Sequence, residues 1–265
     1  MTGFDLRRAA LLARFSDLAY RTPDVIDRVL STHDHELLAF LDEGGTQAFV
    51  AAGRDDTLAI VFRGTQKDRR DILTDIDARF YRAADGRTRI HNGFYRAYRW
   101  VHRQIAECVG DTRFRGVHVA GHSLGGALAQ TAAFRLPGDR LLGCYSYGSP
   151  RVGDADLGAD LGCPHYRLVH GPDIVPWLPF WSMGYRHTGD LYYIATDGRL
   201  IENAPWWRPA LAFVTALPGQ RLKAHRSAAN YVLKLELCAR RRWQRPAGII
   251  HLNRAAAADH PDDGR

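Results

Sequence analysis

Long apolar runs are missing from the 265-residue sequence. No stretch approaches the roughly 18 uncharged apolar residues that a membrane-spanning helix needs, so we expect no transmembrane segment. Charged side chains interrupt the first 20 residues, which are therefore no evident signal peptide and fit an amphipathic helix instead. We expect a cytoplasmic protein or one peripheral to a membrane, and export stays open.

Cysteine is scarce and widely spaced. The four cysteines, Cys108, Cys144, Cys163 and Cys238, form no C-x-x-C pair, so the spacing of a zinc or redox motif is absent. We favour free thiols in a reducing compartment, with disulfides in an exported protein as the alternative. No metal and no cofactor are expected.

Linkers, repeats and low-complexity blocks are also missing. With 46% hydrophobic residues, the chain can form one sizeable core. We therefore expect a single domain over residues 1–265, with an N-terminal helix in 1–20 and a flexible tail from about 250 to 265. The net charge is +7, but the basic residues lie in no recognised nucleic-acid module, so we expect no nucleic-acid partner.

Apolar strands alternate with helical segments through most of the chain. Strands are predicted at 47–53, 57–65, 117–121, 141–150, 165–173 and 190–198, and helices at 95–109, 126–136 and 224–240. Because this alternation is typical of parallel sheets, we predict an α/β protein with a mostly parallel central sheet flanked by helices.

One serine stands where a predicted strand meets a predicted helix, in Gly121-His122-Ser123-Leu124-Gly125. This G-x-S-x-G pattern is typical of a nucleophile elbow, in which small residues let the strand and the helix approach each other. The N–H groups that follow lie at a helix N-terminus, which favours a developing negative charge. We predict that Ser123 is a nucleophile, and a serine hydroxyl needs a base to act as one.

A carboxylate and a histidine downstream of the serine complete the pattern, because α/β hydrolases order their triad as Ser, Asp or Glu, and His. Asp173 ends a predicted strand, where active-site carboxylates are expected in an open α/β sheet. Six histidines follow Ser123, and His225 lies after a loop at the expected start of the last helix, a good position for a base. The aspartates of the glycine-rich loop 154–160 are expected to be solvated.

Seven blocks of the sequence resemble class 3 lipases, the family of the filamentous-fungal triacylglycerol lipases, and they occur in the family's order. The blocks are VFRGT (61–65), TDI (74–76), IHNGFYRAY (90–98), VAGHSLGGALA (119–129), YSYGSPRVGD (145–154), DIVPWLP (173–179) and GYRHTGDLYYI (184–194). The resemblance implies an α/β-hydrolase fold with Ser123 as nucleophile, Asp173 as acid and His225 as base. The family often has a tyrosine within five positions of that histidine, and here Tyr231 is at the sixth.

An oxyanion hole is expected beside the nucleophile, because acyl transfer passes through a tetrahedral oxyanion that needs preorganised N–H donors. One expected donor is the backbone N–H of Leu124, directly after the serine. The resemblance implies Thr65 of the FRGT block as the other. It also places His187 in a block that lines or supports the pocket, with the catalytic base or a purely structural histidine as alternatives.

Four of the six tryptophans lie between the predicted acid and base, in residues 175–185 and 204–214. We expect an acyl-binding wall or a lipid-facing patch there, with core packing as the alternative. The substrate-pocket candidates are His122, Trp177, Trp181, His187, Trp206 and Trp207. The lid of the family corresponds to residues 66–80, where five consecutive charged residues and no tryptophan predict weak interfacial activation.

The predicted function is that of a serine carboxyl-ester hydrolase, a lipase or esterase, which cleaves acyl-lipid esters through an acyl-serine intermediate. Phospholipase A1-type cleavage, acyl transfer and a catalytically idle lipid-binding module on the same fold are the alternatives. The expected partners are an acyl ester or lipid substrate and, transiently, a lipid interface.

Overall fold

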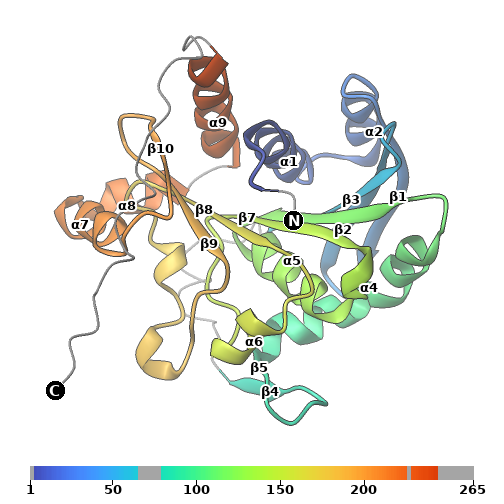
Figure 1. Cartoon of the computed structure of the whole chain (residues 1–265), viewed down its shortest axis with the longest axis horizontal. Helices are drawn as coiled ribbons and strands as arrows, with labels where there is room; N and C mark the ends of the chain where they lie inside the picture. Colours follow the sequence, from blue (N-terminus) through green and yellow to red (C-terminus); the bar gives the residue numbers. More distant parts are fainter. Residues whose placement is uncertain (1–2, 65–78, 226–227, 244–265) are drawn as a thin grey trace, which may run out of the picture.

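The computed structural model describes residues 3–64, 79–225 and 228–243, and an eight-stranded sheet runs through it (Figure 1). The strands, in their order across the sheet, are β1 (His35–Glu43), β2 (Thr46–Gly53), β3 (Thr57–Phe62), β6 (Gly116–His122), β7 (Leu141–Tyr147), β8 (His165–His170), β9 (Asp190–Ile194) and β10 (Leu200–Glu202). Strands β3, β6, β7, β8 and β9 pair in parallel, whereas β1, β2 and β10 pair antiparallel at the two edges. This topology confirms the predicted mostly parallel sheet, with the predicted elbow directly after the central strand β6.

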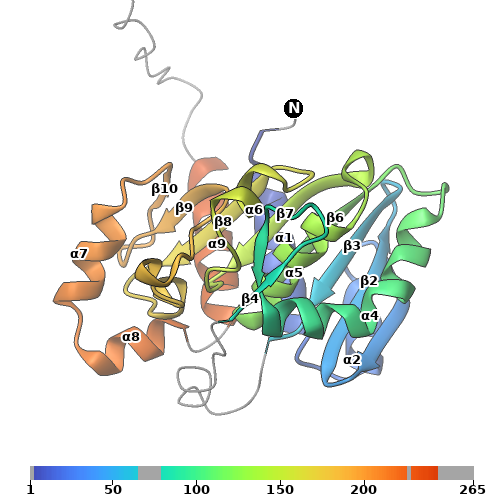
Figure 2. The same ribbon diagram turned by 90° about the horizontal axis from the view of Figure 1, so that it is seen from below.

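Helices cover both faces of the sheet (Figures 1 and 2). Helices α1 (Leu6–Leu18) and α9 (Ala228–Trp243) pack on one face, and α4 (Asn92–Gly110) and α5 (Leu124–Arg135) pack on the other. The remaining elements are α2 (Pro23–Ser31), α6 (Ala155–Ala159), α7 (Trp207–Thr215), α8 (Pro218–His225), the 3-10 turns η1 (Gly138–Arg140), η2 (Val175–Trp177) and η3 (Trp181–Met183), and the hairpin β4 (Phe80–Arg82) and β5 (Arg89–His91). The prediction of a single domain stays a prediction, and the predicted tail lies outside the described residues.

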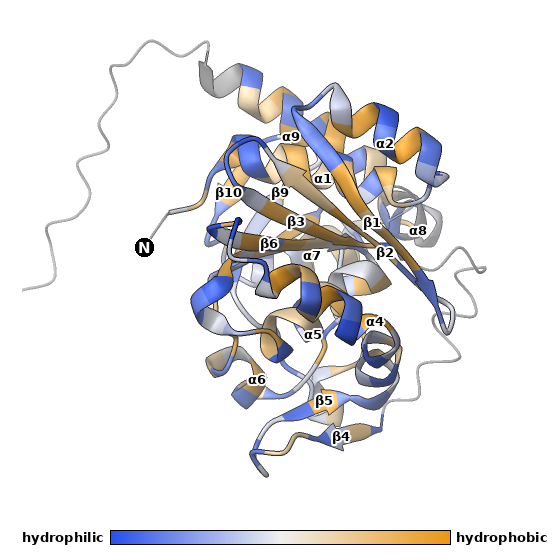
Figure 3. Ribbon diagram, turned by 90° about the vertical axis from the view of Figure 1, so that its right-hand side faces the viewer, coloured by the Kyte–Doolittle hydropathy of each residue, from blue (hydrophilic) through white to orange (hydrophobic). Residues whose placement is uncertain are grey.

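The central strands are apolar on both sides because helices bury both faces of the sheet. Every residue of β3 and β6 is buried, and Figure 3 shows apolar residues along both strands. The predicted N-terminal helix is present as α1: the Asp5 carboxylate caps it by accepting from the N–H of Arg7 at 2.8 Å, and Leu12 and Phe15 are buried against the sheet. Helix α1 is therefore part of the core.

Several elements differ from the sequence-based expectations, among them the short strands β4, β5 and β10 and the helices α6 and α7, which were not predicted. β1 and α2 were not predicted, because the run Leu37–Leu41 has no strict alternation that separates a strand from a helix. The expected loop before the last helix is the helix α8, and His225 is its last residue rather than the start of α9. The four cysteines form no disulfide.

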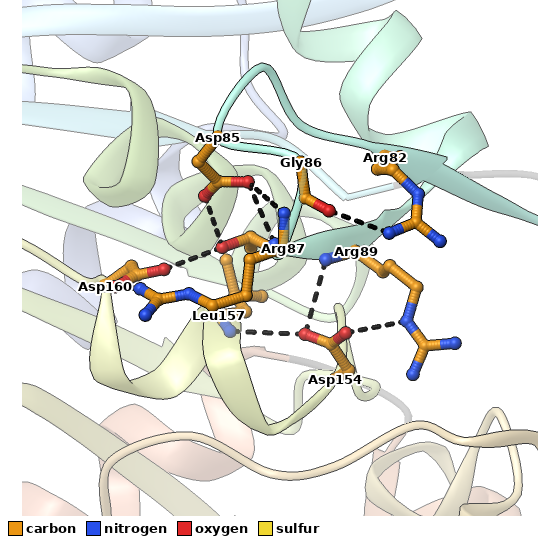
Figure 4. Close-up of polar contacts among 9 residues, drawn as sticks. Arg82, Asp85, Gly86, Arg87, Arg89, Asp154, Leu157 and Asp160 are labelled. Carbon is orange, nitrogen blue, oxygen red and sulfur yellow. Dashed lines mark hydrogen bonds and ion pairs between the residues drawn. The ribbon is translucent and has the colours of Figure 1, made fainter.

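The loop 154–160 is more ordered and less solvated than expected (Figure 4). Asp154 is buried, accepts from the N–H of Leu157 at the start of α6, and pairs with the Arg89 side chain of β5 at 2.8 Å. Asp160 pairs with Arg87 at 2.6 Å in the same network. The spacing did not predict this burial because the partners lie more than 60 residues away, and the network fixes the chain that follows β7 to the β4–β5 hairpin.

A buried histidine, His165, is the first residue of strand β8. The two ring nitrogens of His165 lie 2.8 Å from Ser146 Oγ and 2.7 Å from Thr188 Oγ1. Burial lowers the pKa of His165 to about 3, and burial likewise lowers the pKa of His118 on β6 to about 4. Both histidines are therefore neutral in the folded protein at pH 5, whereas they are protonated there in the unfolded chain.

The stability of the protein should consequently fall as the pH drops below about 6.5, because only the unfolded chain then gains protons at these two sites. Each site should lower the free energy of unfolding by up to about 1.4 kcal/mol per pH unit. Urea unfolding between pH 7 and 5 measures this slope. His118→Gln should reduce the slope, and an unchanged slope would contradict the assignment.

Candidate active site

The predicted elbow lies between β6 and α5, and its backbone is strained. Ser123 has φ 59° and ψ −128°, a region that residues other than glycine rarely adopt, and its N–H donates to the carbonyl of Tyr147 at 2.9 Å. A Cβ on Gly121 would lie 2.2 Å from the backbone of Gly125, and a Cβ on Gly125 would lie 2.2 Å from the carbonyl oxygen of Phe62. Glycine at both positions is thus what lets the strand and helix approach each other around the serine.

His225 contacts this serine although the two residues are 102 positions apart in the sequence. Its Nε2 lies 2.8 Å from Ser123 Oγ, and its Nδ1 lies 3.0 Å from Asp173 Oδ2. All three side chains are buried. The structure therefore brings together the three residues that were predicted from the sequence, and His225 rather than His187 contacts the serine.

Tyr231 is a further member of the site and orients the carboxylate. Its hydroxyl donates to Asp173 Oδ2 at 2.8 Å and accepts from the backbone N–H of His170 at 3.2 Å. Burial raises the pKa of Tyr231 well above its usual range, so the hydroxyl stays a donor. The other carboxylate oxygen of Asp173 accepts from the N–H of Val175 at 2.9 Å. The carboxylate is thus held on both oxygens.

Gly148 leaves the space in which acid and base meet. Its φ is 56°, and a Cβ there would lie 2.6 Å from Asp173 Oδ2, 2.7 Å from the Tyr231 hydroxyl and 3.2 Å from His225 Nδ1. Any side chain at this position would displace the triad, so the glycine after β7 is as necessary to the site as the glycines of the elbow.

Tyr20, just after α1, was missed by the sequence analysis. Its hydroxyl lies 3.3 Å from Nδ1 of His122, and the backbone of Gly64 hydrogen-bonds the same hydroxyl. Burial raises the pKa of Tyr20 to about 12, so its hydroxyl stays protonated. The His122 ring in turn stacks on His225 at 4.9 Å. Tyr20 thereby joins the end of β3 to the elbow, a link between distant segments that no local motif announces.

Only one of the two expected oxyanion donors can be located. Leu124 is the first residue of α5, so its N–H belongs to the first helical turn, where no helical carbonyl is available to accept it. Thr65 and the expected lid through residue 78 lie outside the described residues. The oxyanion hole stays a prediction.

The other pocket candidates are buried to different extents. Trp177 is partly buried, with its ring 5.3 Å from that of Phe213 on α7. His187 hydrogen-bonds the backbone of Pro176, and burial holds its pKa well below the usual range, as in a structural histidine. Trp181, Trp206 and Trp207 are exposed, and the substrate contacts proposed for all of these residues stay predictions.

Comparison with known proteins finds similarity to lipases in both sequence and structure. The family model described as lipase (class 3) matches residues 59–183. The lipase of Rhizomucor miehei is 37% identical over 169 residues, which are 57% of this chain and 46% of that protein. The secreted mono- and diacylglycerol lipase 1 of Fusarium solani is 40% identical over 114 residues, 40% of this chain and 34% of that protein. This chain thus spans less than half the length of either relative.

A solved triacylglycerol lipase, whose catalytic centre is formed by a serine protease triad, superposes with a TM-score of 0.65. It is 27% identical and covers 76% of this chain and 84% of its own. The superposition confirms the predicted α/β-hydrolase fold. Within the part of this chain that the structure describes, no helix is long and apolar enough to cross a membrane.

Proposed function

This chain belongs to the class 3 lipase family, and we propose on that basis that it is a serine hydrolase that cleaves the carboxyl esters of acyl lipids. One observation carries the proposal: a single imidazole lies 2.8 Å from a serine hydroxyl and 3.0 Å from a buried carboxylate. Nucleophile, base and orienting group are therefore in mutual hydrogen-bond reach. A catalytically idle module would not need this alignment or the strained serine.

The reaction follows from the roles of these groups. Ser123 Oγ attacks the ester carbonyl while His225 Nε2 takes the hydroxyl proton, and Asp173 stabilises the resulting imidazolium. The tetrahedral oxyanion is assigned to the N–H of Leu124 and to Thr65. The C–O bond to the alcohol then breaks, His225 returns the proton to the leaving alkoxide, and an acyl-serine remains. Water attacks this ester with His225 as base, which releases the fatty acid and restores the serine.

The substrates proposed are acylglycerols or shorter esters, in keeping with the name of the Fusarium solani relative. Phospholipid cleavage at an acyl ester and acyl transfer to another alcohol use the same groups and remain alternatives. The expectation of a cytoplasmic location gains no support from a relative named as secreted, and we propose only a protein that meets lipid from an aqueous phase.

A labelling and hydrolysis experiment tests the proposal. The folded protein should react with a fluorophosphonate probe and hydrolyse p-nitrophenyl esters, and a panel of rising chain length, a triacylglycerol and a phospholipid ranks the substrates. Absence of both labelling and ester turnover in folded protein would overturn the proposal. Labelling with turnover of the phospholipid alone would replace it by the phospholipase alternative.

A further inference from the structure

Exposed apolar side chains are concentrated on two segments of the molecule. Eight of the thirteen exposed large hydrophobic residues among those described belong to the η3 turn and to the α7 region. They are Phe180, Trp181, Met183, Trp206, Trp207, Leu211, Val214 and Leu217. Exposed apolar residues scattered singly are ordinary, but such a concentration marks a surface that a partner covers.

Helix α7 is apolar on both of its sides. Its inner side packs on the protein, because Ala212 joins the cluster of Val169 and Tyr193 and Phe213 contacts Trp177. Its outer side carries Trp207, Leu211 and Val214 at the spacing i, i+4, i+7, with Leu211 58% and Val214 71% exposed. Figure 2 shows α7 at the outer end of the molecule, beside α8. A helix that is apolar all round requires an apolar environment on both sides.

The charges around these segments select the kind of partner. Residues 174–189 and 203–235 contain no aspartate and no glutamate. Guanidinium groups lie over the tryptophan rings instead, with Arg208 5.5 Å from the ring centre of Trp207 and Arg186 5.9 Å from that of Trp181. Tryptophan combined with arginine is typical of surfaces at a lipid–water boundary, where the ring enters the lipid and the cation meets anionic head groups.

A second copy of the chain fits this surface less well. In a symmetric dimer the same patch would face itself, so that arginines would meet arginines across the two-fold axis with no acidic residue to pair with. Like charges placed opposite each other in an interface are unfavourable. An anionic lipid surface has no such conflict.

We infer that the outer side of α7, assisted by the η3 turn, docks on the surface of an anionic lipid bilayer. The inference rests on the proposed function, in which Asp173 is the acid and His225 is the base. The turns η2 and η3 follow Asp173 directly, and helices α7 and α8 lead directly to His225. Docking by these segments would bring the chain that supports both the acid and the base to the lipid. The α7 surface consists of Trp207, Arg208, Leu211 and Val214.

Vesicle sedimentation tests the inference with a matched pair of variants. Leu211→Ser/Val214→Ser alters the α7 surface, and Leu233→Ser/Leu237→Ser alters two exposed leucines of α9 as the control. With phosphatidylcholine vesicles that contain about one-third phosphatidylglycerol, the α7 variant should bind at least about tenfold more weakly than the wild type, because each inserted side chain contributes apolar burial. The α9 variant should bind within about twofold of the wild type.

Three outcomes would overturn the inference. The two variants could bind the anionic vesicles equally, the wild type could bind pure phosphatidylcholine vesicles as tightly as anionic ones, or the wild type could bind neither kind of vesicle. A wild type that dimerises in sedimentation velocity, with dimerisation lost in the α7 variant, would assign the surface to a second copy. Turnover of a short soluble ester separates this inference from the proposed function. It should be the same in all three proteins if only docking is affected, and its absence in the wild type would contradict the proposed function instead.

Discussion

Replacing Ser123 with alanine should lower kcat for ester hydrolysis by about a millionfold, to the level that the rest of the site supports without a nucleophile. The loss is this large because the acyl-serine cannot form, so His225 and Asp173 have no hydroxyl on which to act. The fold should be retained, since alanine removes one oxygen. Turnover of a p-nitrophenyl ester, measured beside fluorophosphonate labelling, checks both points.

Ser149→Ala is the matched control for this experiment. Ser149 is also fully buried, lies after the neighbouring strand β7, and accepts from the Gln130 side chain at 2.8 Å. It makes no contact with His225 among the hydrogen bonds of the described residues, so its loss should leave labelling intact and change turnover only a few-fold. Substantial turnover by Ser123→Ala would exclude Ser123 as the nucleophile and with it the acyl-serine mechanism.

Replacing Asp173 with asparagine should lower kcat by about ten-thousandfold with little change in fold. The carboxamide of asparagine has no negative charge to stabilise the imidazolium, and its NH₂ group favours the wrong tautomer of His225. The Tyr231 hydroxyl, which donates to Oδ2 at 2.8 Å, would face a donor in one amide orientation, so some loss of stability is expected as well. Stopped assays of the purified variant and its thermal unfolding separate the two effects.

Asp154→Asn is the control for the carboxylate. Asp154 is also buried and pairs with Arg89 at 2.8 Å, but it lies at the start of α6 and not at His225. Its replacement should cost stability and leave kcat within a few-fold. If the two aspartate variants lost activity to the same extent, the loss would report the fold rather than the triad, and Asp173 would lose its assigned role.

The sequence predicted the central strands and Ser123 because both depend on local chemistry, whereas Asp173 and His225 were predicted from the order of the triad and from the resemblance to class 3 lipases. Apolar runs mark buried strands, and the Gly121–Gly125 pattern marks the elbow whatever lies elsewhere in the chain. Tyr20 and Gly148 were not predicted because their roles exist only where distant segments meet. Tyr20 touches His122 from 102 positions away, and Gly148 is defined by the three side chains that would collide with a Cβ.

The neighbourhood of the base was the least predictable part of the site. His225 ends one short helix and Tyr231 lies in the next, so their six-residue separation follows neither a helical nor a strand period. The burial of Asp154 was also not predictable, for a different reason. A glycine-rich polar sequence is typical of a solvated loop, and the ion pair with the arginine of a distant hairpin is what makes the burial of this carboxylate favourable.

The Tyr20 contact sets a lower limit on how far this protein can be shortened. The region that matches the family model, residues 59–183, contains the nucleophile and the acid but lacks the base, the tyrosine on the acid and the tyrosine beside the elbow. A minimal catalyst cut from this chain would have to extend from Tyr20 to Tyr231, more than two hundred residues for a reaction centred on three side chains. Truncation from either side would disable the enzyme well before it reached the serine.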